Sequence, residues 1–96
     1  MEFDWDDGNR DKNLRLHGVH DREIEETFED PHRHVEPTRS ESDERRQLLL
    51  GRSRTSGKYL RIIYTVRVRS GRSFIRPISA MECRATRETG TADEKV

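Results

Sequence analysis

The sequence predicts an α+β fold in which two short N-terminal helices pack on a small antiparallel meander sheet. Residues 9–29 contain two helix-like stretches, separated by a glycine and ended by a proline. Residues 58–69 alternate apolar and polar side chains, which is typical of a half-buried strand. The 96 residues are 29% hydrophobic and 40% charged, so they support one small core. We therefore expect a single domain over residues 1–88 and a flexible C-terminal tail over 89–96.

The two helices are expected over residues 9–17 and 21–29. Gly18 stands where a left-handed residue ends the first helix. In the second helix, Ile24 and Phe28 are four residues apart and share one face. The other faces of the second helix carry carboxylates at Glu23, Glu25, Glu26 and Glu29. Ahead of both helices, the aromatic pair Phe3 and Trp5 is expected to fill the space between helices and sheet.

The sheet begins after a polar stretch that permits a short strand about Val35. A compact apolar strand is expected over residues 47–50, closed by Gly51, and residues 53–57 form a hairpin loop. The clearest strand follows over residues 58–69. Its two faces are Leu60, Ile62, Tyr64, Val66 and Val68 on the core side and Arg61, Ile63, Thr65, Arg67 and Arg69 on the other.

The last strand is expected over residues 73–80, after a turn at Ser70-Gly71. Pro77 cannot donate to a ladder of backbone hydrogen bonds, so this strand is expected at an edge or bulged at Pro77. Residues 84–88 are then predicted to form a short C-terminal helix, which the frayed tail follows.

Charge is segregated along the chain, although the net charge is zero. Between Leu48 and Met81 there are eight basic residues and no acidic one. They are Arg52, Arg54, Lys58, Arg61, Arg67, Arg69, Arg72 and Arg76. A surface of this kind attracts polyanions, and arginine in particular forks onto phosphate. The alternative is a solvated arginine-rich surface that a neighbouring acidic helix balances.

Several classes of protein are excluded by composition. No apolar run approaches the roughly 20 residues of a membrane span, and the acidic start is unlike a signal peptide. With Cys83 as the one cysteine, no intrachain disulfide forms, and the cytosol is the expected compartment. Although His32 and His34 share a strand face, no third ligand is evident, so we expect neither a metal nor another cofactor.

Several short motifs occur together in one order over about residues 3–88. They are Trp5-Asp6, Asn13, His17-Gly18-Val19, Phe28-Glu29-Asp30-Pro31, Glu44-Arg45, Gly51-Arg52-Ser53, Gly57-Lys58-Tyr59-Leu60, Tyr64-Thr65-Val66-Arg67 and Ile75-Arg76-Pro77-Ile78-Ser79-Ala80. In these motifs the chain resembles the BrnT family of toxins. The resemblance implies a RelE-like ribonuclease fold, cleavage of RNA and arrest of translation. It also implies neutralisation by a co-encoded ribbon-helix-helix antitoxin, BrnA, through which alone the complex reaches operator DNA.

The chain departs from the family pattern at three named positions, and the tyrosine that the family usually has near the C-terminus is missing after Glu88. Asn9, Leu16 and Met81 stand where the family usually has Lys, Lys and Arg. Two alternatives to an active toxin therefore stay open. One is a catalytically weakened BrnT-like module that acts mainly as a co-repressor partner of the antitoxin, and the other is an unrelated small RNA-binding domain.

Cleavage by attack of a 2′-hydroxyl needs a proton acceptor, a proton donor and cations at the phosphate. Arg67 and Arg76 fall on neighbouring strands and are expected to clamp one phosphate without a metal. His17 lies in the family motif and is the expected acid–base residue, because histidine is the side chain that ordinarily titrates near neutrality. Alternatively, His17 caps the end of its helix and the arginines are plain surface cations.

Four further cations are expected to bind RNA: Arg52, Lys58, Arg61 and Arg69. The antitoxin is expected to supply apolar contacts and to cover Arg61, Arg67 or Arg76 with carboxylates. In the opposite geometry, the acidic helix about Glu23–Glu29 receives a basic partner and leaves the sheet open.

Overall fold

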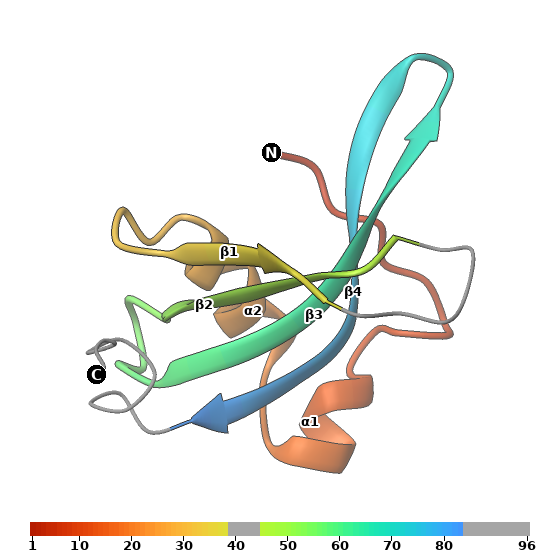
Figure 1. Ribbon diagram of the computed structural model, residues 1–96. Helices are drawn as coiled ribbons and strands as arrows, with labels where there is room; N and C mark the ends of the chain where they lie inside the picture. Colours follow the sequence, from red (N-terminus) through yellow and green to blue (C-terminus); the bar gives the residue numbers. More distant parts are fainter. Residues whose placement is uncertain (39–44, 84–96) are drawn as a thin grey trace.

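A computed structural model describes residues 1–38 and 45–83 (Figure 1). Its helices are α1 (Lys12–His17) and α2 (Asp21–Phe28), and its strands are β1 (His34–Pro37), β2 (Gln47–Arg52), β3 (Tyr59–Arg69) and β4 (Arg72–Cys83). The strands form one sheet in the order β1-β2-β3-β4, with each neighbouring pair antiparallel, so the predicted meander is confirmed. The helix expected at residues 84–88 and the tail expected at 89–96 lie outside the described residues.

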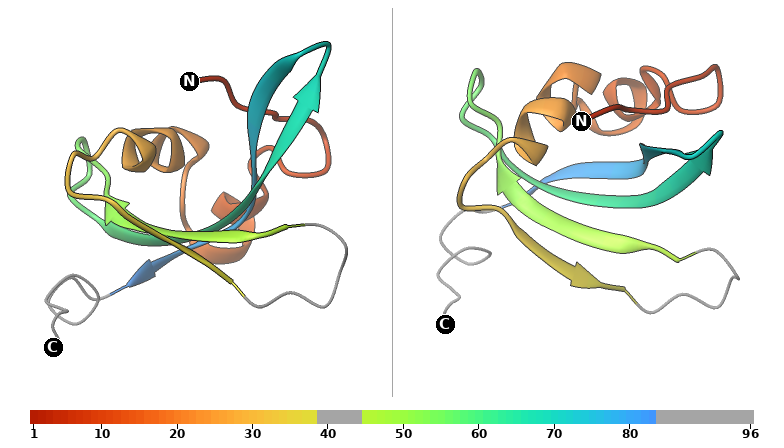
Figure 2. Two further views of the ribbon diagram at one scale, coloured as in Figure 1. Left: turned by 45° about the horizontal axis from the view of Figure 1, so that its top comes forward. Right: turned by 90° about the horizontal axis from the view of Figure 1, so that it is seen from above.

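Both helices lie on the same face of the sheet, and no helix of the described chain covers the other face (Figure 2). Between helices and sheet lies the core, formed by Val19, Ile24, Phe28, Leu49, Leu60, Ile62, Tyr64 and Ala80. Phe3, Trp5 and Ile75 pack against it from the margin. The ring of Phe28 stands edge-on to Phe3 at 5.4 Å and to Tyr64 at 4.9 Å between centroids. The expected aromatic plug is therefore confirmed.

Helix α1 begins at Lys12, three residues later than predicted. Local side-chain hydrogen bonds hold the preceding residues in turns. Asp6 Oδ1 accepts from the Gly8 amide and Asn9 Oδ1 accepts from the Asp6 amide, each at 2.8 Å. Asp11 then takes a left-handed conformation with φ 58°, which is not helical, so the helix begins after it.

The far ends of β3 and β4 leave the core, which overturns one prediction. Val66 and Val68 were expected on the core face with Leu60, but their exposed fractions are 49% and 68%. The register between β3 and β4 shifts beside Ile63 and Tyr64, and the hairpin then extends past the helices (Figure 1). The shift falls at Pro77, which pairs with Tyr64 on an end strand of the sheet, as the missing amide predicted.

Strand β2 continues through Gly51 to Arg52, two residues beyond the predicted end. Gly51 is required by close packing rather than by a turn, because a Cβ atom there would lie 2.9 Å from Thr27 Cγ2. The amide of Arg52 donates to Asp30 Oδ2 at 2.8 Å, which ties the strand to the segment that follows α2.

Candidate nucleic-acid interface

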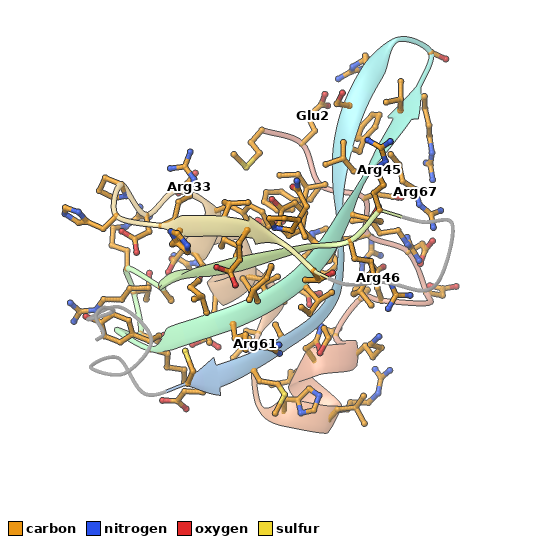
Figure 3. All side chains as sticks on the ribbon, in the orientation of Figure 1. Glu2, Arg33, Arg45, Arg46, Arg61 and Arg67 are labelled. Carbon is orange, nitrogen blue, oxygen red and sulfur yellow. The ribbon has the colours of Figure 1, made fainter. Side chains whose placement is uncertain are left out.

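Arg67 and Arg76 come together at the base of the β3–β4 hairpin. They line one hollow of about 140 Å³, which we call the guanidinium pocket. Its remaining lining residues are Gly8, Asn9, Lys12, Arg46, Pro77 and Ile78. Figure 3 shows Arg67 on β3 and Arg46 just before β2 on the same side of the molecule. Four cationic side chains from four parts of the sequence therefore line one hollow, an arrangement suited to binding a phosphate.

Carboxylates from the N-terminal segment hold Arg76 within this pocket. Its Nη1 and Nη2 atoms donate to the two oxygens of Asp6 at 2.9 and 3.1 Å, which is a bidentate pair. Nη1 also lies 3.4 Å from Asp4 Oδ2. The hydrogen bond from Arg76 holds the pKa of Asp6 below its ordinary value. Arg76 is thus neutralised by this chain's own anions.

The two other arginines of the hairpin are held in the same way. Arg69 Nη2 lies 3.1 Å from Asp4 Oδ2, and Arg72 pairs with the carboxylate of Glu2. Arg69 was expected to bind RNA, but the carboxylate of Asp4, 65 positions earlier in the chain, already pairs with it. The available signal in the sequence was the pair of aspartates at alternate positions 4 and 6, which could have been matched to the arginine-rich hairpin.

Arg52 and Lys58 lie at the opposite end of the sheet. Arg52 stacks over the ring of Tyr59 at 5.3 Å and borders a larger hollow of about 820 Å³, whose rim also carries acidic side chains. Lys58 Nζ donates to the Gly18 carbonyl at 3.2 Å and pairs with Glu23 at 3.3 Å. Lys58 therefore ties the start of α2 to the hairpin loop, and the structure does not bring either cation to the guanidinium pocket.

Arg61 is exposed on the open face of the sheet, which is the face without helices (Figure 3). Across the strands it pairs in register with Leu50 on one side and Met81 on the other. The neighbouring row sets Leu48 beside Ile63. No ion pair of Arg61 occurs among the residues that the structure describes. The open face is thus a half-buried apolar surface around one exposed cation.

His17 is the last residue of α1 and is exposed. Lys12 at the first position of the same helix lines the guanidinium pocket, but His17 does not. Five residues of helix separate them by about 7.5 Å along the axis and about 140° around it. The predicted acid–base residue therefore stands apart from the two predicted arginines.

Asn9, which stands where the family usually has Lys, is buried and has a structural role. Its Nδ2 donates to the carbonyls of Asp4 and Pro77 at 2.9 and 3.2 Å. Asn13, fully buried on α1, accepts from the Ala80 amide at 3.0 Å. These amides fasten the N-terminal segment and α1 to β4, and so they fix one wall of the pocket.

The glutamates of α2, and Glu29 after it, have partners within the described chain. Glu26 accepts hydrogen bonds from the Thr55 hydroxyl and amide and from the Ser53 hydroxyl, which lower its pKa from 4.5 to about 2. Glu23 pairs with Lys58, Glu25 accepts from the Trp5 indole, and Glu29, which follows the helix, pairs with Arg54. The acidic helix is therefore built to hold the β2–β3 loop.

The described residues lack two features, a group of metal ligands and a membrane-spanning helix. Over residues 1–38 and 45–83, no three His, Cys, Asp or Glu side chains are grouped as metal ligands. In the same residues, no helix has the length and apolar character needed to cross a membrane.

The comparisons with known proteins agree with this geometry. No match was found among curated proteins. The family model for BrnT, described as the ribonuclease toxin of a type II toxin–antitoxin system, matches residues 5–87. That range includes both helices, all four strands and every cation of the guanidinium pocket. The chain belongs to the BrnT family of ribonuclease toxins, whose members act on RNA and are paired with an antitoxin.

Proposed function

We propose that this chain is a metal-independent endoribonuclease of RelE-like type that cleaves RNA in the cytoplasm and arrests translation. The observation that supports this is the guanidinium pocket, where Arg67 and Arg76 lie with Lys12 and Arg46. Attack of a 2′-oxygen on the adjacent phosphorus places extra negative charge on the phosphoryl oxygens. Guanidinium groups stabilise that charge more strongly in the transition state than in the ground state.

The double substitution Arg67→Ala/Arg76→Ala tests the pocket. We expect it to weaken binding of a single-stranded oligonucleotide at least tenfold and to abolish cleavage, while far-UV circular dichroism stays unchanged. The matched control Arg15→Ala/Arg33→Ala removes two exposed cations elsewhere. Wild-type oligonucleotide affinity in the first variant would exclude the guanidinium pocket as the RNA site.

His17 stays the proposed acid–base residue, with a test separate from the arginines. Because His17 does not line the pocket, its part in cleavage does not follow from the arginines and needs its own test. We expect His17→Gln to keep RNA affinity and to lose cleavage. A variant that cleaves at the wild-type rate assigns His17 to the end of α1 alone.

A weakened co-repressor module remains the second candidate, because Leu16 and Met81 are exposed apolar side chains where the family usually has cations. Induced expression without the antitoxin separates the two candidates. Growth arrest with RNA fragmentation supports the enzyme, whereas normal growth supports the module. The family match removes the third alternative, an unrelated RNA-binding domain.

The proposed antitoxin is a ribbon-helix-helix protein that carries the complex to operator DNA. We propose that it binds the open face of the sheet. Leu48, Leu50 and Ile63 offer apolar contact there, and Arg61 offers a cation without an ion pair in the described chain. The alternative dock on α2 is disfavoured because its carboxylates already have internal partners. The sequence of residues 84–96 contains no hydrophobic residue larger than valine and is poorly suited to cover this face.

An amphipathic antitoxin segment with a carboxylate opposite Arg61 fits this surface. We expect Arg61→Glu to weaken the complex at least tenfold, and Arg15→Glu to leave it unchanged. An antitoxin that covers Arg61, Arg67 or Arg76 should also compete with RNA for the toxin. If RNA binds the preformed complex as tightly as it binds the free toxin, inhibition by this route is wrong.

A further inference from the structure

The N-terminal residues 2–6, which we call the carboxylate segment, run beside β4 as an added strand. The Asp4 amide donates to the Ile75 carbonyl at 2.7 Å, and the Ile75 amide donates to the Glu2 carbonyl at 2.8 Å. Phe3 and Ile75 form a parallel bridge. Because side chains alternate along an extended chain, Phe3 and Trp5 pack against the core while the carboxylates lie on the other side.

The three carboxylates meet three arginines of the hairpin, which we call the arginine track: Arg69, Arg72 and Arg76. Glu2 pairs with Arg72, Asp4 with Arg69 and Arg76, and Asp6 with Arg76. Alternate residues of an extended segment are about 6.6 Å apart. A row of anions at this spacing on an extended backbone resembles the phosphates of an extended nucleic-acid strand.

The carboxylates differ in exposure, which separates two roles. The side chains of Glu2 and Asp6 are 48% and 52% exposed, whereas that of Asp4 is 7% exposed. Both side chains of the Glu2–Arg72 pair are exposed, and such pairs contribute little net stability, so another anion can replace Glu2 at small cost. Asp6 binds a guanidinium that is only 16% exposed, so its replacement needs an anion that offers two oxygens in the same way, as a phosphate does. Removing the partners of buried Asp4 would leave an unpaired charge, so Asp4 keeps its arginines.

We propose that the arginine track binds successive phosphates of the RNA strand that leaves the guanidinium pocket, and that Glu2 and Asp6 are internal stand-ins that this strand displaces. This inference rests on the proposed function, since it takes RNA as the ligand. Asp4 stays in place and positions Arg69 and Arg76 side by side. The free toxin therefore masks part of its own RNA site. A non-specific anion has to displace the carboxylate of Glu2 or Asp6 to bind the arginines.

The test uses the full-length chain and a fluorescent ten-nucleotide oligo(U) with 2′-O-methyl groups, which binds but cannot be cleaved by 2′-hydroxyl attack. We expect Glu2→Gln/Asp6→Asn to bind this probe at least threefold more tightly than the wild type at low salt. The slope of log affinity against log salt should also steepen, because more counterions are released. The control Asp7→Asn/Glu29→Gln removes the same charge but contacts no arginine of the track.

An equal gain in both double variants would show that only net charge matters. No gain in either would show that RNA displaces no carboxylate, and each of these outcomes would overturn the proposal. Asp4→Asn should weaken probe binding, and a gain there would overturn the positioning role. If Glu2→Gln/Asp6→Asn fails to fold, Glu2→Gln and Arg72→Ala alone give opposite expected shifts, tighter and weaker. If the Arg67→Ala/Arg76→Ala variant binds like the wild type, the proposed function itself is wrong. If only the Glu2 and Asp6 substitutions have no effect, the track alone is wrong.

Discussion

At the end of the sheet where β2 turns into β3, Glu26 lies buried under the loop and accepts three hydrogen bonds from Ser53 and Thr55. At the other end, where β3 turns into β4, Glu2 and Asp6 lie half-exposed on Arg72 and Arg76. We call these the loop end and the hairpin end. Both pair carboxylates with donors across long stretches of sequence, but their surroundings differ.

The difference shows that burial, rather than the charges themselves, decides what a carboxylate does. A buried carboxylate with all its hydrogen bonds made cannot be exchanged without leaving donors unpaired, so the loop end stabilises the fold. A half-exposed carboxylate can be exchanged for another anion, most readily at Glu2–Arg72, where both side chains are exposed, so the hairpin end is available to a polyanion. Substitutions at the loop end should therefore change stability, and substitutions at the hairpin end should change binding.

The largest effect on stability is expected from Gly51→Ala at the loop end. The new Cβ would lie 2.9 Å from Thr27 Cγ2 and 3.2 Å from the Thr27 carbonyl oxygen, so α2 or β2 has to shift. Overpacking of this kind lowers the free energy of unfolding by about 1–3 kcal/mol. Urea denaturation measures it, with exposed Val68→Ala at the hairpin end as the control, where we expect a change within about 0.5 kcal/mol. Equal losses at both ends would contradict the comparison.

Glu26→Gln is expected to lower the melting temperature by several degrees at pH 7. Since the folded pKa of about 2 lies below the ordinary 4.5, the carboxylate stabilises the fold fully above about pH 4.5 and loses this effect as the pH falls toward 2. The deficit of the variant should therefore shrink over that range. Thermal melts at pH 7 and pH 3 measure it, with exposed Glu29→Gln as the reference. A deficit that does not depend on pH would assign the role of Glu26 to packing.

A smaller effect is expected from Lys58→Met. Lys58 was predicted to bind RNA, but it donates to the Gly18 carbonyl and to Glu23. Losing these contacts should lower the free energy of unfolding by about 1 kcal/mol, the typical net value of such a bond. Affinity for the oligo(U) probe should stay within twofold of the wild type. A tenfold loss of affinity with unchanged stability would return Lys58 to the RNA site.

The smallest effect on stability is expected from Leu16→Lys/Met81→Arg, which restores the cations usual in the family. Both side chains are exposed, so the free energy of unfolding should change by less than about 0.5 kcal/mol. If either new cation contacts a phosphate of single-stranded RNA, the salt slope steepens by about 0.7 for each contact. An unchanged slope would mean that neither position faces the bound strand.

Much of the fold was determined by the sequence, because local patterns carry it. The four-residue spacing of Ile24 and Phe28 placed α2, and alternation through Leu60, Ile62 and Tyr64 placed β3 and the core. The missing amide of Pro77 located both the edge strand and the register shift. The Ser70-Gly71 turn predicted that Arg67 and Arg76 lie on neighbouring strands, and both line the guanidinium pocket.

Only the tertiary structure decided which charges meet. The pairs of Glu2 with Arg72 and of Asp6 with Arg76 depend on the N-terminal segment lying beside β4, and no local pattern encodes a contact across some 70 residues. The alternation of apolar and polar residues in β3 did not show that Val66 leaves the core, because the hairpin extends past the helices that would cover it. Periodicity specifies which face of an element is apolar, whereas the partner of each charge depends on how the elements pack. This is why the sequence predicted a basic surface, and the structure showed which of its arginines are already occupied.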